Sequence, residues 1–438
     1  MPRSAIVELS ARNAGFYHVP NIDEEATRKA NELLQANHDR FHIFFNDRGF
    51  HNHTAHYLLS AYALGATAEE LQRMNDSQVT MQVPRQPQVD RIPKDLSDPT
   101  TFIECMSKPE FFHDYVLFFE AEVDKKGVGP VVREYLLSDT PIAKEMLPRL
   151  YASFLHPLIH LGFGLEFDQP AITVEGLAQT AVHQNEVASV LLAAAEQSTT
   201  TPSRPMLDLI HEVHRSGIGQ HPCWGNGATI PDSPLLAAPA ELAAIAGAWQ
   251  VDPDDELEAK TAEMVSVCAY FTAAAQRPPK KVKLDFFFMH NVNCSIFMSA
   301  MLALPWLRRE EKARLLEWKG RCDIIAYANR GAPALDVKEI VGYVPKVPGG
   351  WMDIFRRVND FDDDSHLTKL VRALAAGERF CKPYEGVDDA RFPVRGDMYL
   401  KIAHMAVDAV PGETYFNRWV RGAGFPSQWE PFPNRGEE

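Results

Sequence analysis

Apolar residues recur three or four positions apart through most of this 438-residue chain. Residues with that spacing share one face of an α-helix, so the pattern predicts amphipathic helices that pack through their apolar faces. Residues 24–45 and 53–64 are clear examples, and the second segment ends at Gly65, a residue type that often follows a helix. No series of residues alternates between apolar and polar, and no rhythm of strand and helix indicates a parallel sheet. The chain is therefore expected to be all-α.

Further helices are expected along the rest of the chain. Thr67 and Glu70 have the spacing of a capping box, which predicts that a helix begins there. The other predicted helices cover residues 108–124, 130–138, 145–162, 173–197, 202–215, 234–249, 256–276, 283–303, 309–329, 364–376 and 394–410. Two stretches rich in proline and polar residues, 76–98 and 217–233, are expected to be ordered loops.

No internal repeat and no low-complexity tract divides the chain. Its length is that of two or three typical domains, but the helical pattern continues without a free linker. We therefore predict one large helical domain over residues 1–438. Residues 345–438 are expected to form a region that closes over this domain.

Charge and composition exclude several classes of protein. The chain has 44 Lys and Arg against 59 Asp and Glu, a net charge of −15, which disfavours binding to duplex nucleic acid or to an anionic membrane. No run approaches the roughly 18 apolar residues of a membrane span, and the first residues lack the apolar core of a signal peptide. The six cysteines form no CxxC pair, which is typical of reduced, buried thiols. We expect a soluble, cytoplasmic protein.

Several nucleotide and hydrolase motifs are absent from the sequence. Four GxG sequences occur, but none has the third glycine of GxGxxG, with which a strand–helix turn binds a dinucleotide. There is no Walker A sequence, no GxSxG elbow and no HExxH. The sequence therefore disfavours a self-contained flavin monooxygenase and a P-loop enzyme.

Histidines are the most informative residues of the chain. Sixteen are present, and several occur in pairs that share one face of a predicted apolar helix. The pairs are His53 with His56 and His156 with His160; His366 pairs with Lys369, and His290 follows three phenylalanines. Imidazole nitrogen is a common ligand of iron, copper and zinc, and helical proteins build metal sites from such side chains. The pattern indicates a metal site between helices.

Each of these residues also has a structural interpretation. A buried or capping histidine is more common than a ligand, and His156, just before Pro157, could mark the start of a helical turn. His290 could bond to a backbone carbonyl, and the acids at 362–364 could cap the helix of His366. Glu166 and Asp168 could orient the histidines or serve as polar loop residues.

Lys369 lies on the apolar face of its predicted helix, one turn from His366. One interpretation is a lysine whose stem is buried while its ammonium group reaches water. The other is a buried amine whose pKa falls because its charged form is desolvated. Such a neutral amine can capture carbon dioxide to form a carbamate, which binds metals as a carboxylate does.

The segments that contain these histidines resemble the questin oxidase-like family of fungal polyketide pathways. The similar stretches include FLHPLIHLGFGLEFDQP, DFFFMHNVNCS, HLTKLVRAL and FPVRGDMYLKIAHMAVDAV, in order, over about residues 17–430. The resemblance implies an oxygenase of the Baeyer–Villiger type that opens the central ring of an anthraquinone in secondary metabolism. The products of such a step are benzophenone- or xanthone-type metabolites.

The resemblance also implies an all-α fold with a non-haem iron, Fe(2+). Carried over residue by residue, its ligands are His56, His160, His290, His366 and a carboxylated Lys369. His53 is an alternative to His56, His156 an alternative to His160, and His183 a spare candidate, because the rotation of the helices is not readable from sequence. NADPH enters as a candidate reductant, and no covalent flavin is expected.

Three hypotheses follow for the function. The first is an iron-dependent oxygenase that uses dioxygen to cleave the ring. The second is the same reaction with NADPH or a dissociable flavin and no metal. The third is a non-catalytic helical protein that binds a partner, in which the paired histidines are core residues.

Overall fold

The computed structural model describes residues 3–10, 13–85, 95–198, 202–220, 238–386 and 390–437. The described residues are 64% helical and contain no strand or sheet, only isolated bridges such as that between Phe44 and His51. This confirms the all-α prediction. None of the described helices combines the length and the apolar character needed to cross a bilayer.

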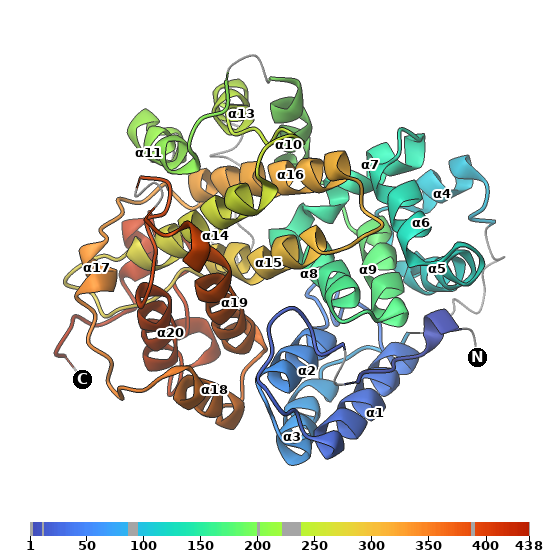
Figure 1. The fold of residues 1–438 in the computed structure, drawn as a ribbon, viewed down its shortest axis with the longest axis horizontal. Coiled ribbons are helices and arrows are strands. Elements are labelled where there is room, and N and C mark those ends of the chain that lie inside the picture. The colour runs from blue at the N-terminus through green and yellow to red at the C-terminus, as the bar shows by residue number, and fades with distance from the viewer. Residues whose placement is uncertain are drawn as a thin grey trace. The chain divides into compact units, whose positions relative to one another are not determined.

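The chain divides into two compact units, whose helices are labelled in Figure 1. The first unit contains residues 1–186, 303–307 and 359–369, and the second contains residues 187–302, 308–358 and 370–438. Each unit is therefore assembled from segments that are distant in sequence. The single domain over 1–438 and the closing role of 345–438 stay predictions.

The helices of the first unit come mainly from the N-terminal part of the chain. They are α1 (Glu24–Arg40), α2 (Thr54–Ala63), α3 (Ala68–Val79), α4 (Pro99–Cys105), α5 (Phe112–Lys126), α6 (Val128–Val132), α7 (Pro141–Leu150), α8 (Ala152–Glu166) and α9 (Pro170–Val182). A π-helical turn, Arg133–Leu137, follows α6. The first turn of α19 (His366–Cys381) also belongs to this unit.

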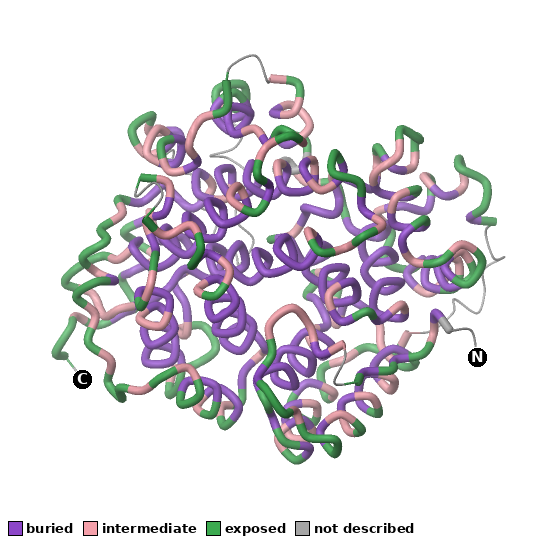
Figure 2. Tube along the Cα trace, in the orientation of Figure 1, coloured by how far each residue is buried: buried purple, intermediate pink, exposed green. Residues whose placement is uncertain are grey.

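Helices α8 and α9 pack closely at the centre of the first unit, and both are almost entirely buried (Figure 2). Two glycines permit this close approach. A Cβ atom on Gly176 would lie 2.6 Å from the Leu161 Cα atom, and one on Gly164 would lie 2.4 Å from the Thr173 nitrogen. Because neither backbone can move away without opening the core, only glycine fits at these two positions.

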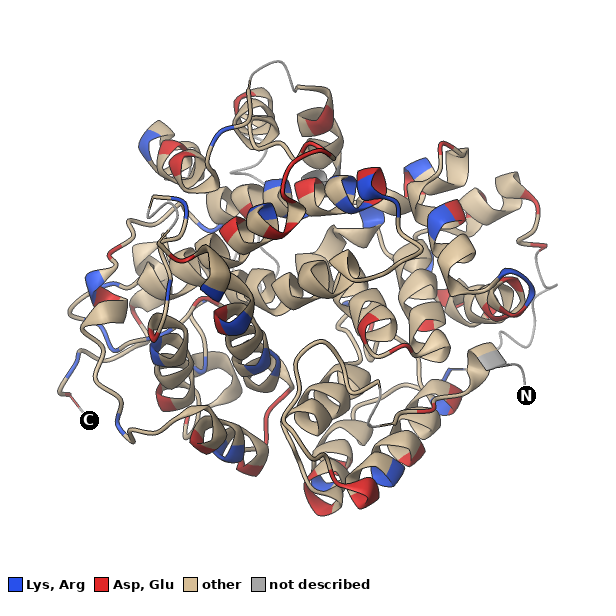
Figure 3. Cartoon of the chain, viewed as in Figure 1, with Lys and Arg blue, Asp and Glu red and all other residues tan. Residues whose placement is uncertain are grey.

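The second unit is built around α14 (Leu257–Ala274), α15 (Phe286–Leu302) and α16 (Arg309–Asn329). Helix α15 has no charged residue, as Figure 3 shows, and it packs against α14 and α16. The other helices of this unit are α10 (Val187–Gln197), α11 (Met206–Ser216), α13 (Pro239–Gly247), α17 (Lys338–Val341), α18 (Trp351–Asp360), the rest of α19 and α20 (Met398–Ala409). A helix that is apolar on all sides is expected at such a central position.

Several predicted elements are confirmed. Helix α16 begins and ends at the predicted residues, 309 and 329. The Thr67 side chain accepts a hydrogen bond from the Glu70 N–H and the Glu70 side chain returns one, as predicted for a capping box. The five cysteines in the described residues are buried and free, in agreement with reduced thiols. Cys223 and most of the predicted 217–233 loop lie outside the described residues.

Two long predicted helices are wrong, because each is interrupted. The segment 173–197 is broken after Val182, where the carbonyls of Ala181 and His183 accept hydrogen bonds from Ser107 instead of from the next turn of a helix. The segment 145–162 is interrupted at Tyr151, between α7 and α8, and again by residues 153–155 near the start of α8, which have left-handed backbone angles. Helices α4, α17 and α18 were not predicted.

Candidate metal centre

All but one of the candidate ligands from the sequence lie in the first unit. His53 immediately precedes α2 and His56 lies on it, His156 and His160 lie on α8, and His366 and Lys369 form the first turn of α19. His290 lies on α15 in the second unit. The paired histidines of the first unit can therefore be compared directly.

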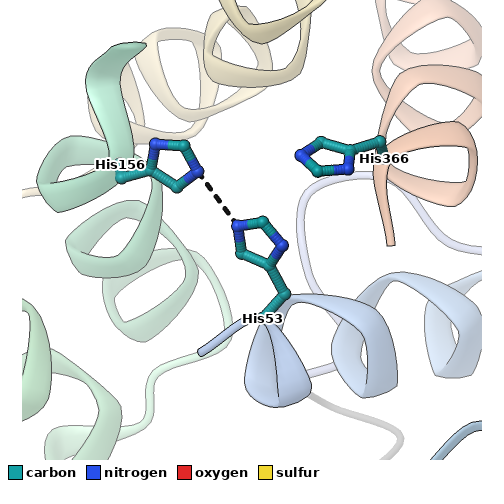
Figure 4. Close-up of side chains that lie close together, drawn as sticks. All are labelled: His53, His156 and His366. Carbon is teal, nitrogen blue, oxygen red and sulfur yellow. Dashed lines mark hydrogen bonds between the residues drawn. The ribbon is translucent and has the colours of Figure 1, made fainter. Parts of the chain in front are cut away.

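His53, His156 and His366 form a group in which one nitrogen of each ring lies within 4.8 Å of those of the other two (Figure 4). The Nε2 atoms of His53 and His156 are 3.0 Å apart. The ring of His366 meets that of His53 edge-on, with 4.8 Å between the ring centroids. His156 and His366 are buried and His53 is half-buried, so three elements bring three imidazoles to one enclosed point.

The other ring nitrogen of each of these histidines faces an oxygen atom. Nδ1 of His53 lies 3.2 Å from the Asp364 carbonyl oxygen, and Nδ1 of His156 lies 2.5 Å from the Ser153 carbonyl oxygen. Nδ1 of His366 lies 2.8 Å from a carboxylate oxygen of Asp364. Because the two carbonyl oxygens only accept hydrogen bonds, the Nδ1 atoms of His53 and His156 carry the proton, as is usual for a histidine that binds a metal through Nε2.

Burial keeps His53 and His156 neutral. It lowers the pKa of His53 and that of His156 well below the ordinary value, and the positive charge of Lys369 lowers both further. A neutral ring whose proton is on Nδ1 has a lone pair at Nε2. The His53 and His156 rings therefore direct two lone pairs at each other across 3.0 Å.

Two facing lone pairs repel unless a proton or a cation lies between them. Two nitrogens that bind one first-row ion at about 2.1 Å, at a right angle, are about 3 Å apart. The donor set and its spacing therefore fit a metal ion that prefers imidazole nitrogen.

The second pair, His56 and His160, has a different arrangement. Nε2 of His56 is 3.0 Å from Nδ1 of His160, and Nε2 of His160 is 2.7 Å from a carboxylate oxygen of Glu175. Glu175 accepts the proton of His160 Nε2, and one proton shared between His56 Nε2 and His160 Nδ1 completes the other contact. This pair is complete without a cation, which favours His53 and His156 as the ligands, the alternatives that the sequence left open.

Lys369 is buried beside this group, with 3% of its surface exposed. Its amine has no hydrogen-bond partner among the described residues. Desolvation lowers the pKa of Lys369 to about 8, although the charges of Asp364 and Asp363 oppose this shift. The snorkelling interpretation is wrong for Lys369, because the amine does not reach water.

His290 is fully buried on α15, and its Nδ1 donates to the Phe286 carbonyl oxygen at 2.7 Å. This bond agrees with the structural interpretation of His290, in which the ring bonds to a backbone carbonyl. It also leaves Nε2 as the acceptor nitrogen. Its place in the ligand set stays a prediction.

The backbone before His156 is strained. Ser153, Phe154 and Leu155 have φ values of 45°, 55° and 68°, in the left-handed region that costs a non-glycine residue roughly 1 kcal/mol or more. The turn brings the Ser153 carbonyl to His156 Nδ1, and right-handed helix follows from His156 onward. The strained turn therefore fixes the orientation of this ring.

Capping acids hold His366 and Lys369 at the start of α19. A carboxylate oxygen of Asp363 accepts a hydrogen bond from the Leu367 N–H, as predicted for the acids at 362–364. Glu166, by contrast, accepts a hydrogen bond from the backbone N–H of Phe16 at 2.7 Å. The orienting carboxylates are Asp364 and Glu175.

Sequence reasoning missed several residues around the site. The ring of His51 stacks on that of His156 with 3.9 Å between centroids, and its Nε2 lies 3.3 Å from Nε2 of His183, the spare candidate. His38 and Glu175 were also not predicted, because their contact joins positions 137 residues apart in the sequence. A lone acid in the apolar segment of α9 was the available signal for Glu175.

Comparison with known proteins adds the family. A family model described as Questin oxidase-like matches residues 50–374, which include all the candidate ligands. The chain is 39% identical to the questin oxidase of Aspergillus fumigatus, over 93% of this chain and 94% of that protein. It is 37% identical to the Baeyer-Villiger oxidase ptaJ of Pestalotiopsis fici (98% and 99%) and 38% identical to the Baeyer-Villiger monooxygenase dmxR6 of Cryptosporiopsis sp. (97% and 98%). The chain belongs to the questin oxidase-like family.

Proposed function

We propose that this protein is an oxidoreductase that cleaves the central ring of an anthraquinone-type polyketide, with non-haem iron and dioxygen. The names of its relatives, questin oxidase and Baeyer-Villiger oxidase, support the reaction class and the substrate class. The geometry of the first unit supports the metal. The substrate is a small aromatic molecule, and NADPH is a candidate reductant.

One observation supports the metal more than any other: the contact between His53 and His156. Both rings carry their proton on Nδ1, where a carbonyl oxygen accepts it, and both rings are neutral. Their Nε2 lone pairs face each other at 3.0 Å. We propose that His53, His156 and His366 hold the iron, which when bound supplies the activation of dioxygen.

Lys369 completes this proposal. A pKa of about 8 leaves roughly a tenth of the amine neutral at pH 7, and the neutral amine attacks carbon dioxide. As the new N–C bond forms, one C=O π bond of carbon dioxide opens to a carboxylate oxygen and the nitrogen releases one proton, so the neutral amine becomes an anionic carbamate; counted from the ammonium form, two protons are released. A carbamate one turn from His366 adds an oxygen ligand and a negative charge to a set of neutral imidazoles.

Iron content and turnover test the proposal together. Purified protein is expected to contain about one iron, and His53→Ala, His156→Ala and His366→Ala are each expected to lose it along with dioxygen-dependent cleavage of a questin-type anthraquinone. His56→Ala is the matched control, because His56 lies on α2, close to His53 in sequence, and is not in the proposed ligand set. Full iron content in His53→Ala together with its loss in His56→Ala would reverse the assignment of the pairs.

The same measurements separate the competing hypotheses. Turnover that needs NADPH and persists without iron supports the metal-free oxidation. A protein that neither retains iron after dialysis nor turns over substrate supports the non-catalytic hypothesis. His290→Ala is predicted from the sequence to lose iron, and retained iron in that variant removes His290 from the ligand set.

A further inference from the structure

Gln179 on α9 is a buried side chain whose amide has no hydrogen-bond partner among the described residues, at its oxygen or at its nitrogen. Its exposed fraction is 0%. Gln169, the buried amide just before α9, is the opposite case. Its oxygen accepts a hydrogen bond from the Glu8 N–H, and its nitrogen donates to the Glu8 and Phe167 carbonyl oxygens. A buried amide without partners is costly, so Gln179 needs an explanation.

The packing of α8 against α9 gives the position of Gln179 along its helix. The two close contacts of the glycines described above show that these helices run antiparallel. Gly176 lies against Leu161, so Gln179, three residues after Gly176, is level with the residue three positions before Leu161. That level falls between the turns of α8 that carry His156 and His160.

The neighbours of Gln179 on its own face of α9 show in which direction the amide points. Glu175, one turn before Gln179, contacts His160, with 2.7 Å from the carboxylate oxygen to Nε2. His183, one turn after it, lies 3.3 Å from His51 between Nε2 atoms, and the ring of His51 stacks on that of a proposed iron ligand. Because residues four positions apart share a helix face, Gln179 faces the same group of histidines.

We infer that Gln179 binds the aromatic substrate, through hydrogen bonds from its amide to a ring carbonyl and to a neighbouring hydroxyl group. The inference rests on the proposed function, which supplies the substrate class. The amide nitrogen donates to the carbonyl oxygen, and the amide oxygen accepts from the hydroxyl group. An amide that is unpaired in the free protein lowers its stability and gains both partners when the substrate binds, as is common for residues of a binding site.

Stability tests whether the amide is unpaired in the free protein. Gln179→Met removes the amide at similar volume, so the urea midpoint of unfolding of metal-free protein is expected to rise. Gln169→Met is the matched control and is expected to lower the midpoint, because it removes three hydrogen bonds. Gln179→Leu repeats the test with a second apolar side chain. A lower midpoint in both Gln179 variants would mean that the amide has a partner inside the protein, and would overturn the inference.

Equilibrium binding tests the role of the amide. The probes are unsubstituted anthraquinone and a monohydroxyanthraquinone whose hydroxyl group adjoins a ring carbonyl, titrated into metal-free protein and followed by quenching of tryptophan fluorescence. Wild-type protein is expected to bind the hydroxylated probe roughly tenfold more tightly than the other. Gln179→Met and Gln179→Leu are expected to lose this preference, and Gln169→Met to keep it. A preference that survives in both Gln179 variants would leave the amide to a water molecule and overturn the inference.

The inference and the proposed function fail by different results. Wild-type protein that binds neither probe contradicts the proposed substrate class, and the inference with it. Wild-type binding that the Gln179 variants reproduce overturns the inference alone. The iron content of both Gln179 variants is expected to equal that of wild type, because the amide is outside the proposed ligand set. Loss of iron in both would make Gln179 part of the metal site, which would also overturn the inference.

Discussion

Two buried lysines, one in each unit, show opposite ways to place an amine inside a protein. Lys319 on α16 is fully buried, and its ammonium group pairs with Asp323 one turn away, with Cys268 also close to both side chains. Burial opposes the charge of Lys319, but the Asp323 carboxylate outweighs it and raises the pKa of the amine. Lys369 has no hydrogen-bond partner among the described residues, and its pKa falls to about 8.

This difference determines which of the two lysines can react with carbon dioxide or bind a metal. A paired ammonium is held as a cation by its carboxylate, so it neither reacts with carbon dioxide nor binds a metal. An unpaired amine whose pKa lies near neutral pH can do both, although burying it lowers the stability of the fold. Sequence alone does not separate the two, because both lie on apolar helices with an acid or a histidine one turn away. The predictions below test this contrast.

The largest effect is expected at Lys369. Lys369→Ala is expected to abolish oxygenation, by roughly 1000-fold or more, while the protein stays folded, because a carbamate ligand is lost and the position is apolar. Lys369→Glu should recover part of the iron content, since a carboxylate replaces the carbamate. Lys369→Arg should recover none, because a guanidinium is a permanent cation. Iron content and turnover, with and without bicarbonate, are measured for all three, and near-normal activity in Lys369→Arg removes Lys369 from the site.

Lys319 is expected to show the reverse pattern. Lys319→Ala leaves the Asp323 carboxylate buried and unpaired, which should lower the free energy of unfolding by about 3–5 kcal/mol. Iron content per folded protein should not change. Denaturant unfolding monitored by circular dichroism measures the first quantity and elemental analysis the second. A variant that is stable but iron-free would show that the two lysines do not differ as described.

The pH dependence of stability distinguishes the two amines without iron or substrate. Between pH 8 and 10.5 the unfolded Lys369 amine binds a proton that the folded one does not, so this residue makes stability rise with pH. The difference between the ordinary pKa of 10.5 and a pKa of about 8 corresponds to roughly 3 kcal/mol across that range. Lys319, whose pKa is raised, contributes stability at all pH values below its ordinary pKa.

The measurement compares two matched variants in metal-free protein from which carbon dioxide has been removed. Lys369→Met is expected to be more stable than wild type at pH 7, and its advantage should disappear by about pH 10.5. Lys319→Met is expected to be less stable than wild type by the same amount from pH 7 to pH 10. If Lys369→Met were more stable than wild type by the same amount at every pH, the pKa of the Lys369 amine would not be lowered in the folded protein.

The contrast between the lysines also shows how far sequence reasoning reaches. The spacing of His366 and Lys369, and the helix of Lys319 from 309 to 329, are local patterns that a 3.6-residue period makes readable. Helix α18 carried the same signal, since Trp351, Ile354, Phe355 and Val358 share a face, but it was not recognised between the surrounding prolines and glycines.

What the sequence does not contain is the rotation of one helix against another. His53 and His56 both precede or begin α2, yet only His53 meets His156, because residues 153–155 turn left-handed and aim that ring. The orienting partner of His160 is Glu175, and His38 joins it from a helix 137 positions away. Such contacts depend on tertiary packing, which the local periodicity of the sequence does not reveal.

The smallest effect is expected when both partners of the second unit's ion pair are replaced together. Lys319→Met with Asp323→Leu removes both charges and fills a similar volume, so no buried charge is left unpaired. Breaking a buried pair is costly, but replacing it with apolar side chains is often neutral or stabilising, so a change within about 1 kcal/mol is expected. The Cys268 thiol, which lies 2.9 Å from Asp323, loses its acceptor, and since a thiol is a weak donor this adds little. Denaturant unfolding of the double variant beside Lys319→Ala provides the comparison. A loss of several kcal/mol in the double variant would mean that the pair supplies more than charge balance, and that Lys319, like Lys369, has a role of its own.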